Sequence, residues 1–311
     1  MIVDERISGY LRALEPDQPE YLARLEKQAI RGKVPIIRKD AQALLRFLLR
    51  MRRPMRLLEI GTAVGYSCMY MSEYMPEGAL IATVEKVPMR LRPAKENLQN
   101  APRAEQIALL VGDAAEVLAK LADGGVKAEP GGRLLRGPAE ESAERPKEHA
   151  DMTGTDIPAE VRAGNLTEAV DGAGQELPAE DRPDGTKAAK EGNLAKAEGL
   201  QEIYLPAGER SAWLGQSFSE PYDLIFLDAA KGQYMNFLPA LLRLLRPDGI
   251  FVTDNVLQEG SIAESKFTIV RRDRTIHKRM REYLYELTHR EELNTVVLPV
   301  GDGMAVTTLR S

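Results

Sequence analysis

Two apolar runs of the sequence end on side chains that can bind a metal ion. The run Leu224–Leu227 is followed by Asp228. A second run, Gly249–Thr253, is followed by Asp254 and Asn255. If both runs are neighbouring parallel strands, their carboxyl ends meet at one edge of the sheet. Two carboxylates and an amide oxygen there form half of an octahedral oxygen shell, which suits Mg²⁺, although any one Asp after a strand is usually a turn residue.

A lysine lies close to the first of these carboxylates in the sequence. Lys231 follows Asp228 by three residues, so it could serve the same site as a general base. Its target would be a hydroxyl group that the metal ion makes more acidic. The alternative is a solvated lysine at the start of a helix, where its charge would oppose the helix dipole.

Three further motifs are typical of a nucleotide cofactor site. In "LLEIGTAVGYS", residues 57–67, Gly61 and Gly65 allow a tight turn before a helix, with a Gly-x-x-x-Gly spacing that differs from the dinucleotide fingerprint. Glu85, after "IATV", could accept hydrogen bonds from both ribose hydroxyls, or it could be an ordinary surface residue. Asp113, in "VGDAAE", could receive an adenine amino group, cap a helix, or do both.

The elements that must position these residues alternate along the chain. Short apolar runs predict buried strands, and amphipathic stretches between them predict helices. The predicted strands are Arg56–Ile60, Leu80–Val84, Ile107–Val111, Asp223–Leu227, Gly249–Thr253, Thr295–Leu298 and Met304–Leu309. The predicted helices include Tyr66–Tyr74, Met89–Gln99, Tyr234–Leu245 and Arg274–Arg290. This alternation indicates an α/β fold with a doubly wound sheet, in which ligands bind beyond the carboxyl ends of the strands.

Composition limits the kind of protein and the kind of metal. The 311 residues could form one large domain or two small ones, and no apolar stretch of 18 residues predicts a membrane span. The charged start of the chain is not a secretory signal, so we expect a cytoplasmic protein. A single cysteine, Cys68, and three scattered histidines disfavour a zinc site and leave a hard cation held by oxygen.

A polar segment interrupts the alternation of strands and helices. Residues 122–202 are rich in Ala, Glu, Gly, Pro and Asp, and the tripeptide Pro-Ala-Glu recurs there at 138, 158 and 178. Such a low-complexity insert buries too little apolar surface to offset its ordering entropy, so we predict disorder. It would separate an N-terminal and cofactor-binding half, 1–121, from a metal and acceptor half, 203–311, of one domain. The insert is acidic, whereas the rest of the chain is mildly basic.

Six motifs in order resemble a known family, the metal-dependent class I O-methyltransferases of the caffeoyl-CoA and catechol type. They are "LLEIGTAVGYS", "TVEK", "GDA", "YDLIFLDAAKGQY", "DNVLQEG" and "PVGDGMAV", and together they span all of the chain except the insert. The resemblance implies a Rossmann-like sheet of seven strands with the last strand antiparallel, and S-adenosylmethionine and Mg²⁺ as cofactors. It implies Lys231 as the base and Asp228, Asp254 and Asn255 as the metal ligands. The implied cofactor contacts are Ile37, Gly61, Ser67, Glu85, Asp113, Ala114 and Asp228.

Within the family, "YLARLEKQAIRGKVPIIRKDA", "DAAKGQY" and "DNVL" are similar to the bacterial branch that converts 5-hydroxyuridine at the tRNA wobble position to 5-methoxyuridine. Gln258 departs from this branch, because an aromatic residue often follows "DNVL". The resemblance implies a tRNA anticodon loop as substrate and a homodimer. Basic clusters at residues 50–56 and 266–281 are consistent with RNA, although charged helix faces are usually only solvated.

Three alternatives to this function remain open at the level of sequence. The first is a catechol-type or caffeoyl-CoA-type methyltransferase that acts on small molecules. The second is an RNA-binding protein without catalysis, which would have no need of the Asp-Asp-Asn-Lys set. The third is a nicotinamide-dependent oxidoreductase, which the glycine spacing disfavours.

Overall fold

A mostly parallel eight-stranded sheet forms the centre of the computed structural model, which describes residues 3–128, 134–135 and 199–310. The strand order is β6-β3-β2-β1-β7-β8-β10-β9. The strands are β1 (Arg56–Ile60), β2 (Leu80–Glu85), β3 (Ile107–Gly112), β6 (Leu200–Tyr204), β7 (Tyr222–Leu227), β8 (Leu245–Thr253), β9 (Leu293–Leu298) and β10 (Met304–Leu309). A separate two-stranded ribbon pairs β4 (Lys127–Ala128) with β5 (Leu134–Leu135).

The sheet is doubly wound, as the sequence predicted. The strands β3, β2, β1, β7 and β8 are parallel neighbours, and β10 is antiparallel to both β8 and β9. The chain adds strands outward in one direction from β1 and then in the other direction from β7. The order therefore reverses between β1 and β7, which is where ligands bind in sheets of this kind.

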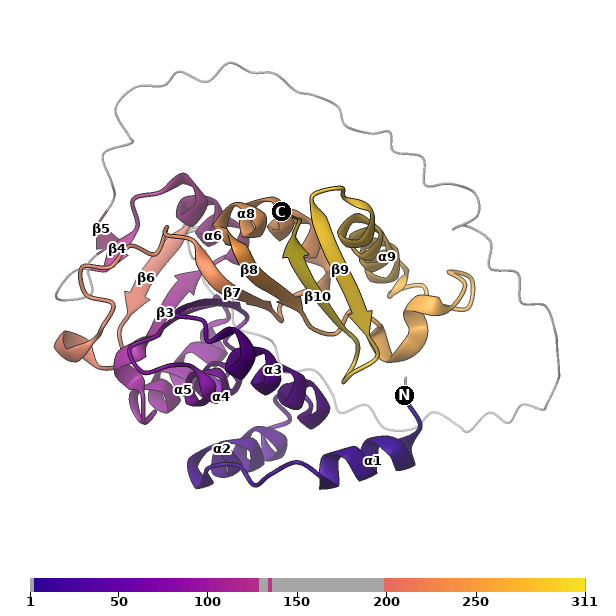
Figure 1. Cartoon of the computed structure of the whole chain (residues 1–311), viewed down its shortest axis with the longest axis horizontal. Coiled ribbons are helices and arrows are strands. Elements are labelled where there is room, and N and C mark those ends of the chain that lie inside the picture. Colours follow the sequence, from indigo (N-terminus) through magenta and orange to yellow (C-terminus); the bar gives the residue numbers. More distant parts are fainter. Residues whose placement is uncertain (1–2, 129–133, 136–198, 311) are drawn as a thin grey trace, which may run out of the picture. The chain divides into compact units, whose positions relative to one another are not determined.

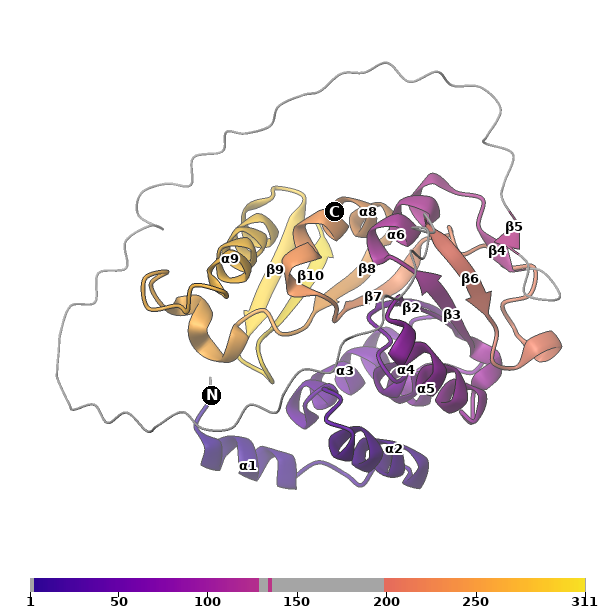
Figure 2. The same ribbon diagram turned by 180° about the vertical axis from the view of Figure 1, so that it is seen from behind.

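Helices cover both faces of the sheet (Figures 1 and 2). One face carries α3 (Lys39–Arg52), α4 (Tyr66–Tyr74) and α5 (Pro88–Gln99), and the other carries α6 (Ala114–Asp123), α8 (Tyr234–Leu244) and α9 (Arg274–His289). Two further helices, α1 (Glu5–Ala13) and α2 (Glu20–Arg31), precede α3. The short 3₁₀ turns are η1 (Ala104–Gln106), η2 (Gly208–Arg210), η3 (Lys231–Gln233) and η4 (Gln258–Ala263).

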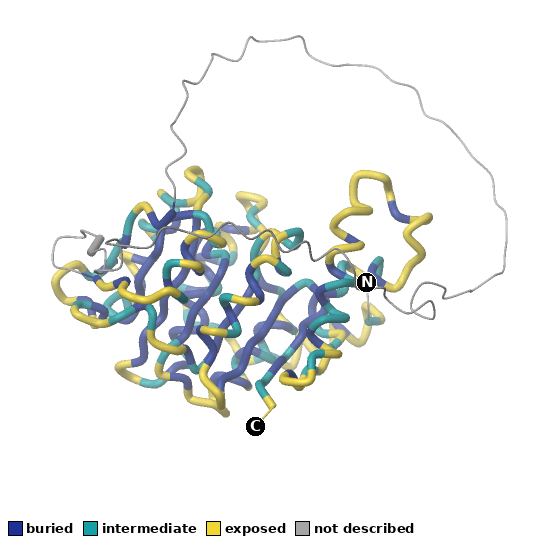
Figure 3. Tube along the Cα trace, turned by 90° about the horizontal axis from the view of Figure 1, so that it is seen from above, coloured by how far each residue is buried: buried dark blue, intermediate teal, exposed yellow. Residues whose placement is uncertain are grey.

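Two hydrophobic clusters, one on each face, explain why the central strands are largely apolar. In β7, Ile225 and Leu227 belong to one cluster, whereas Leu224 and Phe226 belong to the other. Side chains alternate between the faces of a strand, so a strand covered on both sides is apolar at most positions and buries any polar exception, such as Glu59 in β1. The burial of the central strands along their length is visible in Figure 3.

All seven predicted strands are present, and the antiparallel last strand is confirmed. The sheet also has an eighth strand, β6, which pairs antiparallel with the edge strand β3. The predicted boundaries of the insert, 122–202, are corrected at both ends, because residues 122–128 and 199–202 belong to the folded unit. Val126, Ala128 and Leu200 are buried in one of the two clusters. The predicted disorder of residues 136–198 lies outside the described residues.

None of the helices within the described residues is long and apolar enough to cross a membrane.

Candidate active site

All ten residues that the sequence predicted for the site line one cavity. It has a volume of about 740 Å³ and lies beyond the carboxyl ends of β1, β2, β3, β7 and β8, where the strand order reverses. Apolar cavities with a few convergent polar groups at this place are the usual ligand sites of doubly wound sheets. The ten residues are Ile37, Gly61, Ser67, Glu85, Asp113, Ala114, Asp228, Lys231, Asp254 and Asn255.

The parallel hydrogen-bond ladder continues one residue beyond the strands and aligns the site. The first backbone N–H after a strand donates to the carbonyl at the end of the neighbouring strand. The bonds are Gly61 N–H to the Val84 carbonyl (3.0 Å), Asp228 N–H to the Ile60 carbonyl (3.0 Å) and Asp254 N–H to the Leu227 carbonyl (3.0 Å). Gly61, Asp228 and Asp254 therefore lie in a row across adjacent strand ends.

Glycine is required at position 61 for two reasons. Its φ of +108° is in the region that other residues rarely adopt. In addition, a Cβ atom at this position would overlap the backbone carbonyl oxygen of Asp228. The glycine turn therefore allows β1 and β7 to approach closely at the switch point, and Gly65, with φ of +86°, then leads into α4.

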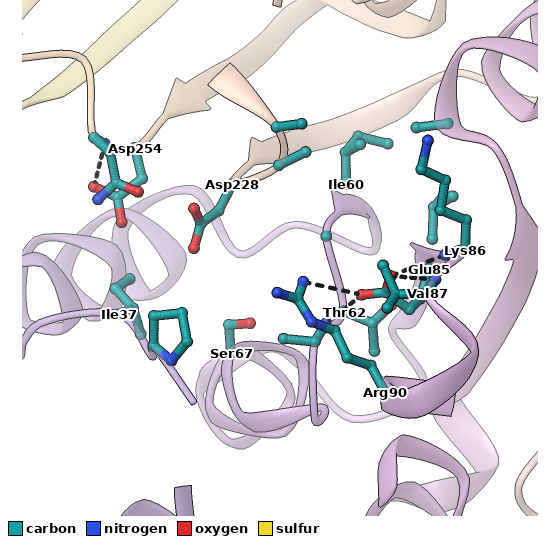
Figure 4. Close-up of a pocket in the computed structure, with 18 of the residues that line it drawn as sticks. Ile37, Ile60, Thr62, Ser67, Glu85, Lys86, Val87, Arg90, Asp228 and Asp254 are labelled. Atoms are coloured by element: carbon teal, nitrogen blue, oxygen red, sulfur yellow. Dashed lines mark hydrogen bonds and ion pairs between the residues drawn. The ribbon is translucent and has the colours of Figure 1, made fainter. Parts of the chain in front are cut away.

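The two carboxylates predicted to bind metal lie together at one end of the cavity, where Asp254 is buried and Asp228 is partly buried. Asp228 and Asp254 point into the same space in Figure 4. Burial raises the pKa of both groups, and the charge of Asp228 raises that of Asp254 further. Within the described residues neither carboxylate forms an ion pair, and only Asp254 accepts a hydrogen bond, from the Asn255 N–H at 2.6 Å. Two neighbouring acids whose charges disfavour each other fit a divalent cation.

The donor set consists of oxygen atoms only. Asn255 adds an amide beside the two carboxylates, and its backbone is left-handed, with φ of +58°. In the part of the chain that the structure describes, no group of three or more His, Cys, Asp and Glu side chains is arranged around a metal position. The proposed set has only two such side chains, the third ligand being the amide of Asn255. Two carboxylates and one amide suit magnesium, which retains water or substrate oxygens in its other positions.

Lys231 begins the turn η3, and its partner is a residue that the sequence analysis did not single out. The Nζ atom lies 3.6 Å from Oδ2 of Asp302, which is buried and also lines the cavity. The other carboxylate oxygen of Asp302 accepts the Glu259 N–H, and its backbone carbonyl accepts the Leu257 N–H at 3.0 Å. Asp302 thus connects the lysine to the loop after Asn255. In the sequence, the only feature that could have pointed to this residue is its place between two glycines in the motif "PVGDGMAV".

Glu85 lies at the opposite end of the cavity from the two aspartates (Figure 4). Its carboxylate accepts backbone N–H groups from Ala63 (2.9 Å), Lys86 (2.9 Å) and Val87 (2.8 Å), and it lies 3.9 Å from the guanidinium of Arg90. These bonds fix its orientation, and a carboxylate with about four acceptor sites retains capacity for a ligand hydroxyl. Arg90 also lines the cavity and was not among the residues predicted from the sequence.

Asp113 is a helix cap, as one of the two sequence interpretations proposed. Its Oδ1 atom accepts the Ala115 N–H at 2.9 Å at the start of α6. Its Oδ2 atom lies 2.8 Å from Nζ of Lys86, and this hydrogen bond lowers the pKa of the carboxyl group. The predicted contact with adenine is compatible with this geometry and stays a prediction.

Ile37 is held over the cavity by a buried glutamine that the sequence did not reveal. The Ile37 carbonyl accepts a hydrogen bond from Nε2 of Gln42 at 2.8 Å. The Oε1 atom of Gln42 accepts bonds from Gln18 (3.0 Å) and from the hydroxyl of Tyr66 (3.3 Å), the first residue of α4. One side chain therefore joins the segment before α3, the segment before α2 and the helix that follows the glycine turn.

Together, the order of the strands, the glycine turn, the acid that ends β2 and the acids that follow β7 and β8 define a Rossmann-like methyltransferase fold. The sequence pattern of the O-methyltransferase family matches residues 13–130 and 169–310. The chain therefore belongs to the O-methyltransferase family, as the six motifs had indicated.

Curated relatives share moderate identity with short parts of the chain. Tricin synthase 2 of Oryza sativa subsp. japonica is 33% identical over 86 residues, which is 27% of this chain and 30% of the relative. The catechol O-methyltransferase of Niastella koreensis is 31% identical over 84 residues, or 26% of this chain and 38% of the relative. The matches thus cover well under two thirds of these curated relatives.

Solved structures share the fold over almost the whole chain. A Podospora anserina methyltransferase bound to S-adenosylhomocysteine has a TM-score of 0.61 at 17% identity, covering 99% of this chain and 95% of the other. The O-methyltransferase TomG from Streptomyces achromogenes, in complex with S-adenosylmethionine, has a TM-score of 0.59 at 17% identity, covering 98% and 96%. At these identities the likeness establishes the fold.

Proposed function

We propose that the protein transfers a methyl group from S-adenosylmethionine to a hydroxyl oxygen in a magnesium-dependent reaction. The observation that carries this proposal is the arrangement within one cavity. A glycine turn and Glu85 at one end are suited to a nucleoside, and two neighbouring carboxylates with Asn255 at the other end are suited to a hard cation.

Each residue has a role that follows from its place in the cavity. Glu85 would bind the ribose hydroxyls, Asp113 the adenine amino group, and Gly61 would allow the cofactor to approach the backbone. Four other side chains would pack on or orient the cofactor, namely Ile37, Ser67, Ala114 and Asp228.

The acceptor end would prepare the oxygen for attack. Asp228, Asp254 and Asn255 would hold the magnesium ion, which lowers the pKa of an acceptor hydroxyl when bound. Lys231 would take the proton from that hydroxyl, with Asp302 keeping the amine in position. The walls of the cavity would hold the oxygen and the methyl group near contact distance, which accounts for much of the rate.

The acceptor that we propose is 5-hydroxyuridine at the wobble position of tRNA, methylated to 5-methoxyuridine in the cytoplasm. Support comes from the motifs shared with that branch and from the basic surface beside the cavity. An anticodon loop presents unpaired bases, so a uridine can enter a pocket without melting a duplex. The second candidate is a catechol or a caffeoyl-CoA-like small molecule, which the names of curated relatives favour.

We further propose a homodimer that uses the N-terminal helices. Ile7, Tyr10 and Leu11 of α1 and Leu14 after it are between 48% and 66% exposed. Their spacing places them on one face of the helix, which a second copy could cover. Sedimentation equilibrium tests this assignment, and a monomer at micromolar concentration would contradict it.

The decisive experiment is methyl transfer from labelled S-adenosylmethionine to two acceptors, with and without Mg²⁺. One acceptor is tRNA that contains 5-hydroxyuridine, and the other is a simple catechol. Magnesium-dependent label in the tRNA alone supports the proposed acceptor, and label in the catechol alone supports the second candidate. The variant Asp254→Ala is expected to abolish transfer and to retain affinity for S-adenosylhomocysteine. Turnover within a few-fold of wild type in this variant would contradict the metal assignment.

A further inference from the structure

The connection between β8 and α9 exposes apolar side chains next to the acceptor end of the cavity. Residues 263–276 are exposed to solvent except for Ile269, which anchors the segment. Phe267 is 77% exposed and Val270 is 62% exposed. In Figure 1 this orange segment extends outward between η4 and α9. Together these two side chains leave apolar surface available for contact with another molecule.

The same segment is strongly basic. Between residues 264 and 281 the chain contains seven Lys and Arg residues and only two Asp and Glu residues. The amine of Lys266 lies 5.1 Å from the ring centre of Phe267, so charge and aromatic surface are presented together. Further along, Arg274, Lys278 and Arg281 are spaced so that they follow one side of α9.

This surface is continuous with the mouth of the cavity. The guanidinium of Arg279 on α9 donates a hydrogen bond to the Gly232 carbonyl at 2.9 Å, directly after Lys231. The segment also begins a few residues after Asn255, and Arg38 of the cavity wall pairs with Glu259 in between at 3.0 Å. A polymer lying on the basic segment could therefore place one of its units at the acceptor end.

We infer that residues 264–281 form a docking surface for a single-stranded RNA loop, with Phe267 as a stacking platform for a base. This inference rests on the proposed RNA substrate and adds the surface that binds it. Lysine and arginine neutralise phosphates without reading sequence, and an aromatic ring stacks on any base. Seven basic residues are spread from Lys266 in the loop to Arg281 in the N-terminal half of α9, which is more cations than the three phosphates of a CoA ester require.

The test measures binding directly and needs no methyl acceptor. A fluorescein-labelled RNA stem-loop of 17 nucleotides, with unmodified uridine in its loop, is titrated with the full chain at several salt concentrations. The variants are Phe267→Ala and the double variant Arg271→Ala/Arg272→Ala. The matched controls are Ile30→Ala and Arg31→Ala on α2, which remove an exposed apolar side chain and an exposed charge elsewhere.

The two kinds of variant are expected to weaken binding in different ways. Phe267→Ala is expected to reduce RNA affinity about tenfold and to leave the salt dependence unchanged, because stacking involves no counterion release. The double arginine variant is expected to lower the slope of log K against log salt by about 1.4, or about 0.7 for each phosphate contact. The controls and the affinity for S-adenosylhomocysteine are expected to remain at the wild-type level.

Three outcomes would overturn the inference. The first is a wild-type chain that does not bind the RNA. The second is a set of variants that bind the RNA as tightly as the controls do. The third is a loss of affinity in the variants that is seen only for the competing ligands, vesicles of phosphatidylglycerol or coenzyme A, and not for the RNA. The proposed acceptor is tested separately. If the surface variants lose RNA affinity while the wild type methylates only the catechol, the docking surface stands and the proposed acceptor fails.

Discussion

A buried glutamate beneath the glycine turn provides a sharp test of the electrostatics of the site. Glu59 in β1 is fully buried, and its Oε1 atom has no hydrogen-bond partner within the described residues. Burial raises the pKa of its carboxyl group to about 7, and the hydroxyls of Ser67 and Thr83 oppose this rise by hydrogen bonding. The substitution Glu59→Gln keeps the shape and an oxygen that can accept the Thr83 hydroxyl, but it removes the ionisable proton.

The sign and size of the effect follow from the two pKa values. In the unfolded chain Glu59 ionises near its usual value of 4.5, and in the folded chain it ionises near 7. The folded state therefore holds the proton more tightly, and its stability falls as the pH rises from 4.5 to 7. The full difference in pKa corresponds to a loss of about 3 kcal/mol of folding stability. This loss is absent below pH 4.5 and complete above pH 7.

The assay is urea denaturation of wild type and Glu59→Gln between pH 4.5 and pH 8. The variant is expected to gain stability relative to wild type as the pH rises, by about 3 kcal/mol at pH 8. Glu77→Gln, which removes the same charge from an exposed position, is the control and is expected to show no such trend. Parallel stability profiles for wild type and Glu59→Gln would refute the assignment of a raised pKa to this group.

Three further predictions concern the site itself. Gly61→Ala is expected to lose about 2–5 kcal/mol of stability and most affinity for S-adenosylhomocysteine, because the new Cβ atom overlaps the Asp228 carbonyl. The control is Gly78→Ala, because Gly78 also has a positive φ but has no neighbour within 4 Å of the added Cβ atom. In urea denaturation this control is expected to lose only about 1 kcal/mol of stability, and equal losses for both variants would contradict the steric argument. Asp302→Asn is expected to lower kcat at least about tenfold with unchanged cofactor affinity, because the amine of Lys231 loses its charged partner. A kcat within twofold of wild type would exclude this positioning role. Treatment with EDTA is expected to abolish methyl transfer and to spare S-adenosylhomocysteine binding measured by calorimetry, with activity restored by Mg²⁺; activity that survives chelation would rule out the metal.

The central strands could be predicted because their signal is local. A strand covered on both faces is apolar at most positions, so β1, β2, β3 and β7 appear in the sequence as short, largely apolar runs. The strand β6 was missed because it lies at the sheet edge and mixes apolar with polar residues in "LQEIY". Nothing within such a segment indicates that it pairs with β3, which precedes it by almost ninety residues.

The site residues that follow strands could be predicted for the same reason. In a doubly wound sheet the position after a parallel strand faces the ligand whatever the rest of the chain does. This rule found Asp228, Asp254 and Glu85, and the structure places all three in the cavity. Asp302 escaped it because it lies in the turn between β9 and β10, and only the folded chain brings that turn to Lys231.

Residue types and their spacing along the chain were sufficient to predict the alternation of strands and helices, the glycine turn, and an oxygen-rich set after β7 and β8. These features depend on residue type, periodicity and position relative to a strand end, and each can be recognised within about a dozen residues. The folded chain was needed to show that Asp302 faces Lys231, that Gln42 holds Ile37 over the cavity, and that β6 completes the sheet. Those contacts join segments that are far apart in the chain or run across separate elements. They form because the packed sheet and helices bring their backbones together, which no local pattern encodes.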